Sequence, residues 1–290
     1  MVDRAGREPR PQAAALPPVS VVVTTYEQCD ALRQGLPAML EQEYAQEFEV
    51  IVVDMNSSDD TLPYLQTLED RYPNLRVVRM PDTARNVSPI RLALALGIRA
   101  AAYEWVAITQ ANCQPASPHW LTWMGRQCAE EEATDIVVGY TRFTRRSGWN
   151  ALRCRFFRLW QQMLHLSYAG HHGAYRCEGC NLMYRRSFFI AHRGFAEDVN
   201  LLVGATDIMV NHNSNTRLCL HPEAFMRQTC PDTSRWWQQD RLFFMETRRH
   251  FRRWLRYRLV YLSHVGLTWL FSLSTLAALL VETIVFENYI

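Results

Sequence analysis

The stretch EWVAITQANCQPASPHWL, Glu104–Leu121, decides how the rest of the chain is interpreted. Its apolar run Trp105–Thr109 predicts a buried strand, which ends in the polar turn Gln110–Cys113. Ser117 then predicts a helix cap, with Pro118 at the first helical position. Open α/β sheets bind ligands where a strand end is followed by a loop and a helix start. We therefore expect a ligand site at this turn.

Strand and helix patterns alternate around this stretch at the spacing of βαβ units. The expected strands are Val19–Thr25, Phe48–Asp54, Leu75–Met80 and Trp105–Thr109. The expected helices are Asp30–Gln42, Thr61–Tyr72 and a segment that opens at Ser88. Pro37 falls inside the first helix and should kink or interrupt it. The alternation predicts an α/β fold with a mainly parallel, doubly wound sheet and right-handed crossovers.

Beyond Glu132 the pattern is less regular. We expect one strand over Ile136–Phe143, a short strand over Asn181–Arg186, and helices over Trp149–Tyr168, Ser187–Phe195, part of Leu201–Asn211 and Ser234–Arg258.

The C-terminal part contains a candidate membrane segment. Val265–Val281 carries no charge, and with the apolar residues before it approaches the roughly 20 residues that a bilayer span requires. Six arginines in residues 248–258 alternate with aromatic residues, as at headgroup depth. By the positive-inside rule, the globular part should lie on the cytoplasmic side of the inner (plasma) membrane. His264 and Glu282 make the span imperfect, and a buried amphipathic helix pair is the alternative.

These patterns predict four regions. They are a disordered tail over 1–17, a globular domain over 18–245, a basic aromatic interfacial segment over 246–258 and a transmembrane helix over 259–286.

Charge and cysteine content bear on the classes of function that the chain can have. The net charge is +2, and the one basic run adjoins the apolar segment, which disfavours nucleic-acid binding. Residues 1–18 show no export signal, so we expect the eight cysteines to be reduced. Cys177 and Cys180 form a lone CxxC pair near His171 and His172. This pair is either a metal site or, as the simpler alternative, two packed thiols beside a glycine turn.

A series of segments resembles family 2 glycosyltransferases, which have the GT-A fold. Val19–Thr25 with Tyr26 and Glu27 is similar to the opening strand that ends P-T-Y-N, and Glu49–Thr61 is similar to V-I-V-V-D-D-G-S-x-D-x-T. The likeness continues through Leu94–Ala101, Gly179–Leu182, Tyr184–Phe189 and His192–Phe195. It covers residues 18–244, and membrane-anchored bacterial members look most similar.

The resemblance implies inverting transfer of a sugar from a nucleotide-sugar donor, most simply a UDP-sugar, to a glycan or lipid-linked acceptor in polysaccharide biosynthesis. It implies donor contacts from Thr25, Tyr26, Glu27 and Asp54. As an alternative, Asp54 caps the turn that follows it. The family's second aspartate is Met55 here, and its glycine is Asn56.

The family's metal motif D-x-D falls on Gln110–Asn112, where both carboxylates are amides. The family is expected to use Mg²⁺ or Mn²⁺, which prefer anionic oxygen ligands, so this turn should bind them weakly. The two amides either contact the sugar or simply cap the loop. Arg85, Arg91 and Arg241 are candidate cations in place of the metal.

The family's acidic catalytic motif falls on Gly204–Ile208, where Asp207 is the only acid left. Asp207 is therefore the candidate general base, or alternatively a favourable charge at a helix N-terminus. The family's Q-x-x-R-W motif resembles Gln238–Arg241, which would hold the diphosphate or the acceptor. The alternative for this segment is an amphipathic helix with aromatic core contacts.

Two functional hypotheses follow from these changes. One is an active membrane-attached glycosyltransferase. The other is a catalytically impaired relative that binds nucleotide-sugars or acts as a scaffold in polysaccharide assembly. A membrane-associated α/β protein of another kind is the third, weaker alternative.

Overall fold

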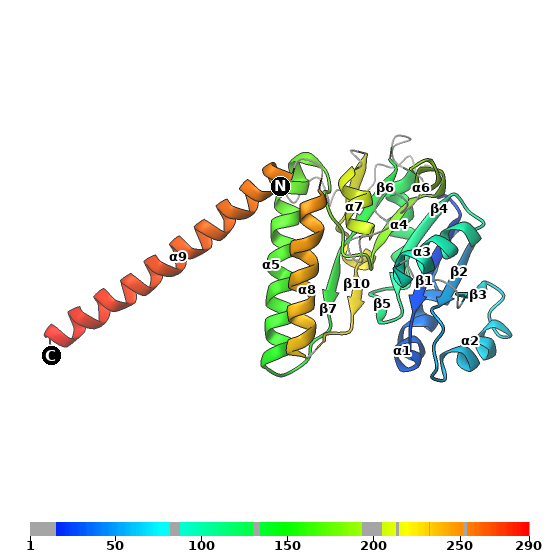
Figure 1. Ribbon diagram of the computed structural model, residues 1–290, viewed down its shortest axis with the longest axis horizontal. Coiled ribbons are helices and arrows are strands. Elements are labelled where there is room, and N and C mark those ends of the chain that lie inside the picture. Colours follow the sequence, from blue (N-terminus) through cyan, green and yellow to red (C-terminus); the bar gives the residue numbers. More distant parts are fainter. Residues whose placement is uncertain are drawn as a thin grey trace. The chain divides into compact units, whose positions relative to one another are not determined.

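The computed structural model describes residues 16–81, 88–129, 134–192, 205–212, 215–231, 233–251 and 254–289 (Figure 1). These residues form two compact units, one ending at Thr247 and one beginning at Arg248. The expected tail over 1–17 lies outside the described residues except for Leu16 and Pro17, and so does Arg85.

A seven-stranded sheet forms the centre of the first unit. Its order is β3-β2-β1-β4-β8-β6-β9. The bounds are β1 Val19–Thr25, β2 Phe48–Asp54, β3 Leu75–Arg79, β4 Trp105–Gln110, β6 Ile136–Gly139, β8 Leu182–Arg185 and β9 Thr216–Cys219. The first four strands are mutually parallel, while β8 runs antiparallel to both β4 and β6. The predicted GT-A-like, mainly parallel sheet is confirmed.

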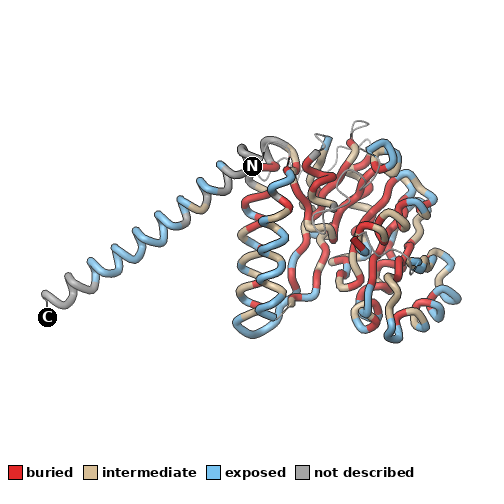
Figure 2. The backbone as a smooth tube through the Cα atoms, viewed as in Figure 1, coloured by how far each residue is buried: buried red, intermediate tan, exposed pale blue. Residues whose placement is uncertain are grey.

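Helices cover both faces of this sheet because successive strand residues point to opposite sides. In β1, Val21 and Val23 pack with α1, α2 and α4, while Val22 packs with α3, α6 and α7. The helices are α1 Cys29–Leu40, α2 Thr61–Glu69, α3 Pro89–Ala100, α4 Trp120–Ala129, α5 Trp149–His172, α6 Arg186–Ala191, α7 Ala205–His212 and α8 Ser234–Thr247. Figure 2 shows that the central strands are buried, as their continuous apolar runs predict.

The prediction of a single strand over Ile136–Phe143 is wrong. The chain leaves the large sheet after Gly139, and β7 (Thr141–Phe143) belongs to a second sheet of order β5-β10-β7. The Asn181 side chain occupies the space beside Gly139, and its amide donates to the Tyr140 carbonyl at 3.0 Å. This contact fixes the point at which the chain changes sheets. The other two strands are β5 Cys113–Pro115 and β10 Met226–Gln228.

Several predicted helix boundaries change. α1 continues through Pro37 to Leu40 without interruption; the carbonyl that loses its hydrogen bond belongs to Arg33, which is exposed to solvent. α4 begins at Trp120, because the Ser117 hydroxyl accepts from the His119 amide in a turn before the helix, at 2.9 Å.

The predicted continuous helix over Ser234–Arg258 is also wrong. α8 ends at Thr247, a 3₁₀ turn follows over Arg248–His250, and α9 covers Trp254–Tyr289. Within α9, Val265–Glu282 has a mean hydropathy of 1.7 and none of it is buried. By length and composition, it is the one helix of the described chain that could cross a membrane.

Gly35 couples α1 to the turn singled out in the sequence. A Cβ atom at position 35 would overlap the backbone carbonyl of Cys113, immediately after Asn112. We predict that Gly35→Ala lowers the free energy of unfolding by about 1–3 kcal/mol, because a backbone atom cannot rotate away. Chemical denaturation measures this. Gln34→Ala, on the exposed side of the same helix, is the control and should change stability by less than about 0.5 kcal/mol. Equal stability of the two variants would contradict the close packing.

Candidate active site

The carboxyl ends of the parallel strands bring the predicted site residues to one edge of the sheet. Thr25 on β1 is in register with Asp54 on β2, and Thr24 is in register with Gln110 on β4. This is the edge where parallel α/β sheets bind ligands.

Asp54 is fully buried and serves the turn that follows β2. It accepts hydrogen bonds from the Ser57 hydroxyl at 2.6 Å and from the Ser57 amide at 3.3 Å. In this conformation Asp54 holds the loop, as in the capping alternative. Thr25 is also buried, whereas Tyr26 beside it is 52% exposed.

Two residues in the loops after β1 and β2 have left-handed backbones. Glu27 has φ 49° and Asn56 has φ 60°. Asparagine is among the residues that tolerate this conformation. The Glu27 amide donates to the Ser57 hydroxyl at 2.9 Å, while the Ser58 hydroxyl donates to the Glu27 carboxylate at 2.7 Å. The two loops therefore support each other.

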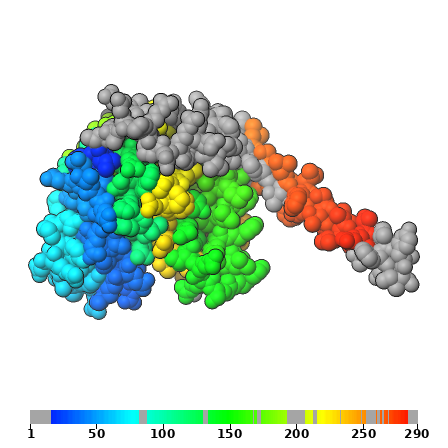
Figure 3. All heavy atoms as spheres, turned by 180° about the vertical axis from the view of Figure 1, so that it is seen from behind, coloured from blue at the N-terminus to red at the C-terminus, as the bar shows by residue number. Residues whose placement is uncertain are grey.

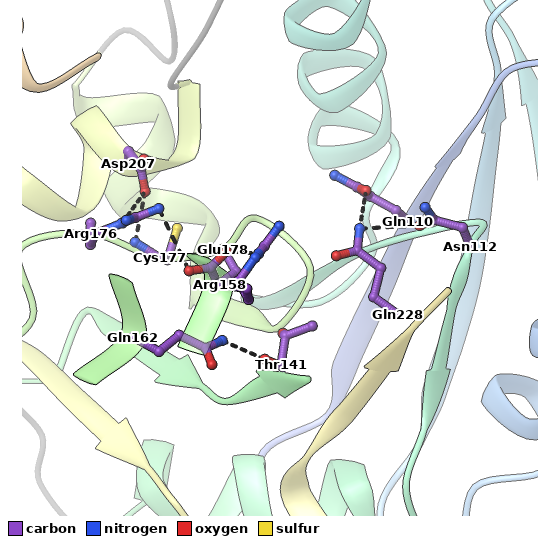
Figure 4. Close-up of polar contacts among 10 residues, drawn as sticks. All are labelled: Gln110, Asn112, Thr141, Arg158, Gln162, Arg176, Cys177, Glu178, Asp207 and Gln228. Atoms are coloured by element: carbon purple, nitrogen blue, oxygen red, sulfur yellow. Dashed lines mark hydrogen bonds and ion pairs between the residues drawn. The ribbon is translucent and has the colours of Figure 1, made fainter. Parts of the chain in front are cut away.

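Gln110 and Asn112 share a hydrogen-bond donor. The Gln228 side-chain amide on β10 donates to Gln110 Oε1 at 3.3 Å and lies 3.5 Å from Asn112 Oδ1 (Figure 4). The side chains of Gln110 and Asn112 thus contact a residue of the second sheet, which agrees with the loop-capping alternative. Sequence reasoning missed Gln228, because nothing in the local pattern indicates that β10 lies beside β5.

The side-chain oxygens of Gln110 and Asn112 do not fit a divalent metal ion. The two side chains are neutral, and their oxygens face an N–H donor rather than an open position. Among the described residues, no three His, Cys, Asp or Glu side chains form a group that could hold a metal. The Gln110–Asn112 turn therefore has no negative side chain of the kind that a Mg²⁺ or Mn²⁺ site requires.

A cleft of about 300 Å³ lies next to this turn. Gln110 lines it from β4, and Asp207 lines it from α7. Asp54 and Asn112 are not among its lining residues. We call Gln110–Asn112 the amide turn. The structure thus brings together Gln110 of the amide turn and the candidate base Asp207, but leaves Asp54 outside their cleft.

A buried cluster of charged residues forms one wall of the cleft (Figure 4). Glu178 contacts Arg158 on α5 and lies 3.6 Å from Arg176. Arg176 Nε is 3.9 Å from Asp207 Oδ1, which also accepts from the Cys177 amide at 2.8 Å. The Nε atoms of both arginines are buried without a hydrogen-bond partner among the described residues.

Burial dominates the acid–base behaviour of this cluster. Burial raises the pKa of Asp207, while nearby Arg176 and the Cys177 amide act in the opposite direction. Burial likewise lowers the pKa of Arg158. Both shifts disfavour the charged forms, as expected for charges removed from water.

The cations predicted from the sequence do not line the cleft within the described chain. Arg91 is 2% exposed on α3 and lies outside the lining. Arg241 is exposed on α8, with its guanidinium 4.6 Å from the centre of the Trp237 ring. Gln238 is likewise exposed outside the lining, whereas Asp240 of the same segment lines the cleft.

The CxxC segment supports the wall of the cleft. Cys177 and Cys180 are buried free thiols, and Gly179 between them has φ 67°. This agrees with the packed-thiol alternative. His171 and His172 belong to α5, but their side chains lie outside what the structure describes.

Comparisons with known proteins agree with this fold. The chain is 28% identical over 134 residues to hyaluronan synthase of Pasteurella multocida, which is 46% of this chain and only 13% of that protein. It resembles the mannosyltransferase PcManGT of Pyrobaculum calidifontis, solved with GDP-Man and Mn²⁺, at TM-score 0.60 and 21% identity over 80% of this chain and 63% of that one. It also resembles TarS of S. aureus, solved with UDP-GlcNAc, at TM-score 0.52 and 16% identity over 74% of this chain and 59% of that one.

The family match covers more of the chain than the sequence match to hyaluronan synthase. The model of glycosyl transferase family 2 matches residues 20–193, which is 174 of the 290 residues. The chain belongs to glycosyl transferase family 2.

Proposed function

We propose that the chain transfers a sugar, with inversion, from a nucleotide-sugar donor to a hydroxyl group of a glycan or lipid-linked acceptor. The observation that carries the proposal is one cleft lined by both Gln110 and Asp207, at the edge where the parallel strands end. A donor bound at the amide turn would place its sugar toward the candidate base. The proposal includes attachment to the inner membrane through α9, with the first unit on the cytoplasmic side.

The relatives support a nucleotide-sugar donor. PcManGT was solved with GDP-Man and TarS with UDP-GlcNAc. We propose a UDP-sugar for this chain. PcManGT was also solved with Mn²⁺, whereas the Gln110–Asn112 turn here provides no anionic ligand for a metal ion.

Arg158 and Arg176 are the cations that we assign to the diphosphate in place of a metal ion. Both line the cleft, and both have a buried side-chain nitrogen without a hydrogen-bond partner among the described residues. A guanidinium group donates well to phosphate oxygens and stays charged at neutral pH. Such donors would stabilise the negative charge that develops on the leaving nucleotide.

Asp207 is the group that we assign to proton transfer. Its carboxylate would accept the proton of the acceptor hydroxyl while that oxygen forms a bond to the anomeric carbon. The bond between the anomeric carbon and the diphosphate oxygen breaks in the same step, and the nucleoside diphosphate leaves with the electron pair. A pKa raised by burial suits this role, because a general base works best with a pKa near the working pH.

The hydrogen bond and the ion pair of Asp207 favour a second candidate function. Asp207 already accepts a hydrogen bond from the Cys177 amide and lies near Arg176, so part of the bonding capacity of its carboxylate stabilises the fold. A protein that binds the donor in this cleft without turnover is therefore the alternative.

Donor binding should not require a divalent metal. We predict that calorimetry with UDP gives the same affinity in EDTA and in Mg²⁺ or Mn²⁺, because Gln110 and Asn112 offer no carboxylate. The double variant Gln110→Asp with Asn112→Asp should bind UDP more weakly in EDTA and recover affinity when Mn²⁺ is added. Gln114→Asp adds a charge on the exposed face of β5 and is the control. A wild-type protein that requires metal would show that the amide turn still coordinates one.

Transfer should depend on the ionised form of Asp207. That form is present above the raised folded-state pKa and is lost as pH falls through it, so kcat/KM should decline toward acid at a pH above the ordinary aspartate range. We predict that Asp207→Asn lowers kcat by roughly 10²–10⁴-fold.

Measurements of stability and of UDP affinity distinguish a loss of catalysis in Asp207→Asn from misfolding. The asparagine side chain of the Asp207→Asn variant keeps an oxygen for the Cys177 amide, and Arg176 keeps its ion pair with Glu178, so the fold should be kept and UDP affinity should not fall. Asp70→Asn, at an exposed site after α2, is the control and should leave transfer intact. Unchanged turnover in Asp207→Asn would remove Asp207 from the reaction, and absence of turnover in the wild type with tight UDP binding would favour the binding role.

A further inference from the structure

Helix α5 exposes an apolar stripe and buries polar residues. Among its described side chains, every exposed one is apolar: Trp149 at 72%, Leu152 at 52%, Phe156 at 69%, Leu159 at 50% and Met163 at 63%. Their spacing of three and four residues places them along one side of the helix. We call these five residues the α5 stripe.

The inner side of the same helix is unusually polar. Arg158, Gln161, Gln162 and His165 are all buried there. An ordinary surface helix has the opposite arrangement, with its apolar face toward the core. The polar side is held by the cleft wall, where Arg158 contacts Glu178, and by Gln162, which donates to the Thr141 carbonyl. The α5 stripe is therefore held outward by the contacts of the active-site wall.

Helix α8 lies along α5 (Figure 1). The Phe157 and Trp237 rings are 6.3 Å apart, and the Arg153 guanidinium lies 4.0 Å from the centre of the Trp237 ring. On α8, Leu242 and Met245 are 63% and 41% exposed. In the view from behind, α5 (green) forms an outer surface of the first unit (Figure 3). An exposed apolar stripe of this length marks an interaction surface.

The charges beside the stripe are positive. α5 contains no Asp or Glu, Arg153 and Arg155 are half-buried on its sides, and Arg145 is exposed in the segment before it. Helices that lie in a membrane interface combine aromatic and aliphatic residues on one face with arginines at its margin. Two copies of α5 paired face to face would bring like charges together, with no acidic residue on the helix to balance them. The same chain also contains the candidate membrane span in α9.

We infer that the α5 stripe lies on an anionic phospholipid bilayer and forms a membrane contact of the first unit that is separate from α9. The apolar side chains enter the acyl boundary, and the arginines beside them meet lipid phosphates. This contact does not depend on whether the cleft catalyses transfer.

Site-specific photo-crosslinking of the full-length chain tests the inference. Benzoylphenylalanine replaces Phe156 in one variant and Ile190 in the control; Ile190 is 57% exposed on α6, away from α5. Each variant is irradiated with vesicles of phosphatidylcholine and phosphatidylglycerol, and adducts are identified by mass spectrometry. We expect lipid adducts at 156 in at least tenfold excess over 190. Protein–protein adducts at 156 would indicate a second copy instead, and equal or absent lipid adducts at the two positions would overturn the inference.

A charge-reversal variant tests the role of the arginines. Arg145→Glu with Arg155→Glu, in the chain that carries the probe at 156, should lower lipid adducts several-fold with anionic vesicles. The same substitutions should have a smaller effect with vesicles of phosphatidylcholine alone. Circular dichroism checks that both variants keep their helices. Undiminished adducts with anionic vesicles would contradict a contact with lipid phosphates.

Discussion

The buried charges of Arg158, Arg176, Glu178 and Asp207 are the interaction on which the rest of the first unit depends. They join α5, the segment before β8 and the start of α7 around one cleft. Removing one partner from a buried ion pair typically costs about 3–5 kcal/mol, because the other charge stays buried without compensation. The cluster therefore constrains both the wall of the cleft and the orientation of α5.

The Gln110–Asn112 turn is neutral, whereas the wall of the neighbouring cleft is charged. Gln110 and Asn112 are neutral and accept from the Gln228 amide, so the turn is held without negative charge. The positive charge of the cleft comes from Arg158 on α5 and from Arg176. On our proposal the loss of anionic metal ligands and the presence of buried arginines are two parts of one change, since a diphosphate needs one source of positive charge. The same placement of Arg158 turns the apolar side of α5 outward.

Sequence reasoning predicted the parts of the fold that local patterns determine. The β-branched runs at Val19–Thr25 and Phe48–Asp54 became buried parallel strands, because such runs fit the interior of a parallel sheet. Asn56 follows β2 in a left-handed backbone conformation that asparagine tolerates. The pattern could not show that Asn181 ends β6 at Gly139, or that Gln228 reaches the amide turn, because both contacts join distant segments. For α5 it predicted a helix, but periodicity does not say which side is covered, and so Arg158 was missed.

The central claim is that arginines, and no metal ion, meet the diphosphate of the donor in this cleft. A crystal structure of the protein grown with UDP and Mn²⁺ tests it most directly. We expect phosphate oxygens within hydrogen-bond distance of Arg158 or Arg176, and no Mn²⁺ between the phosphates and the Gln110–Asn112 turn. A diphosphate bound through Mn²⁺ at that turn, or bound away from both arginines, would contradict the claim.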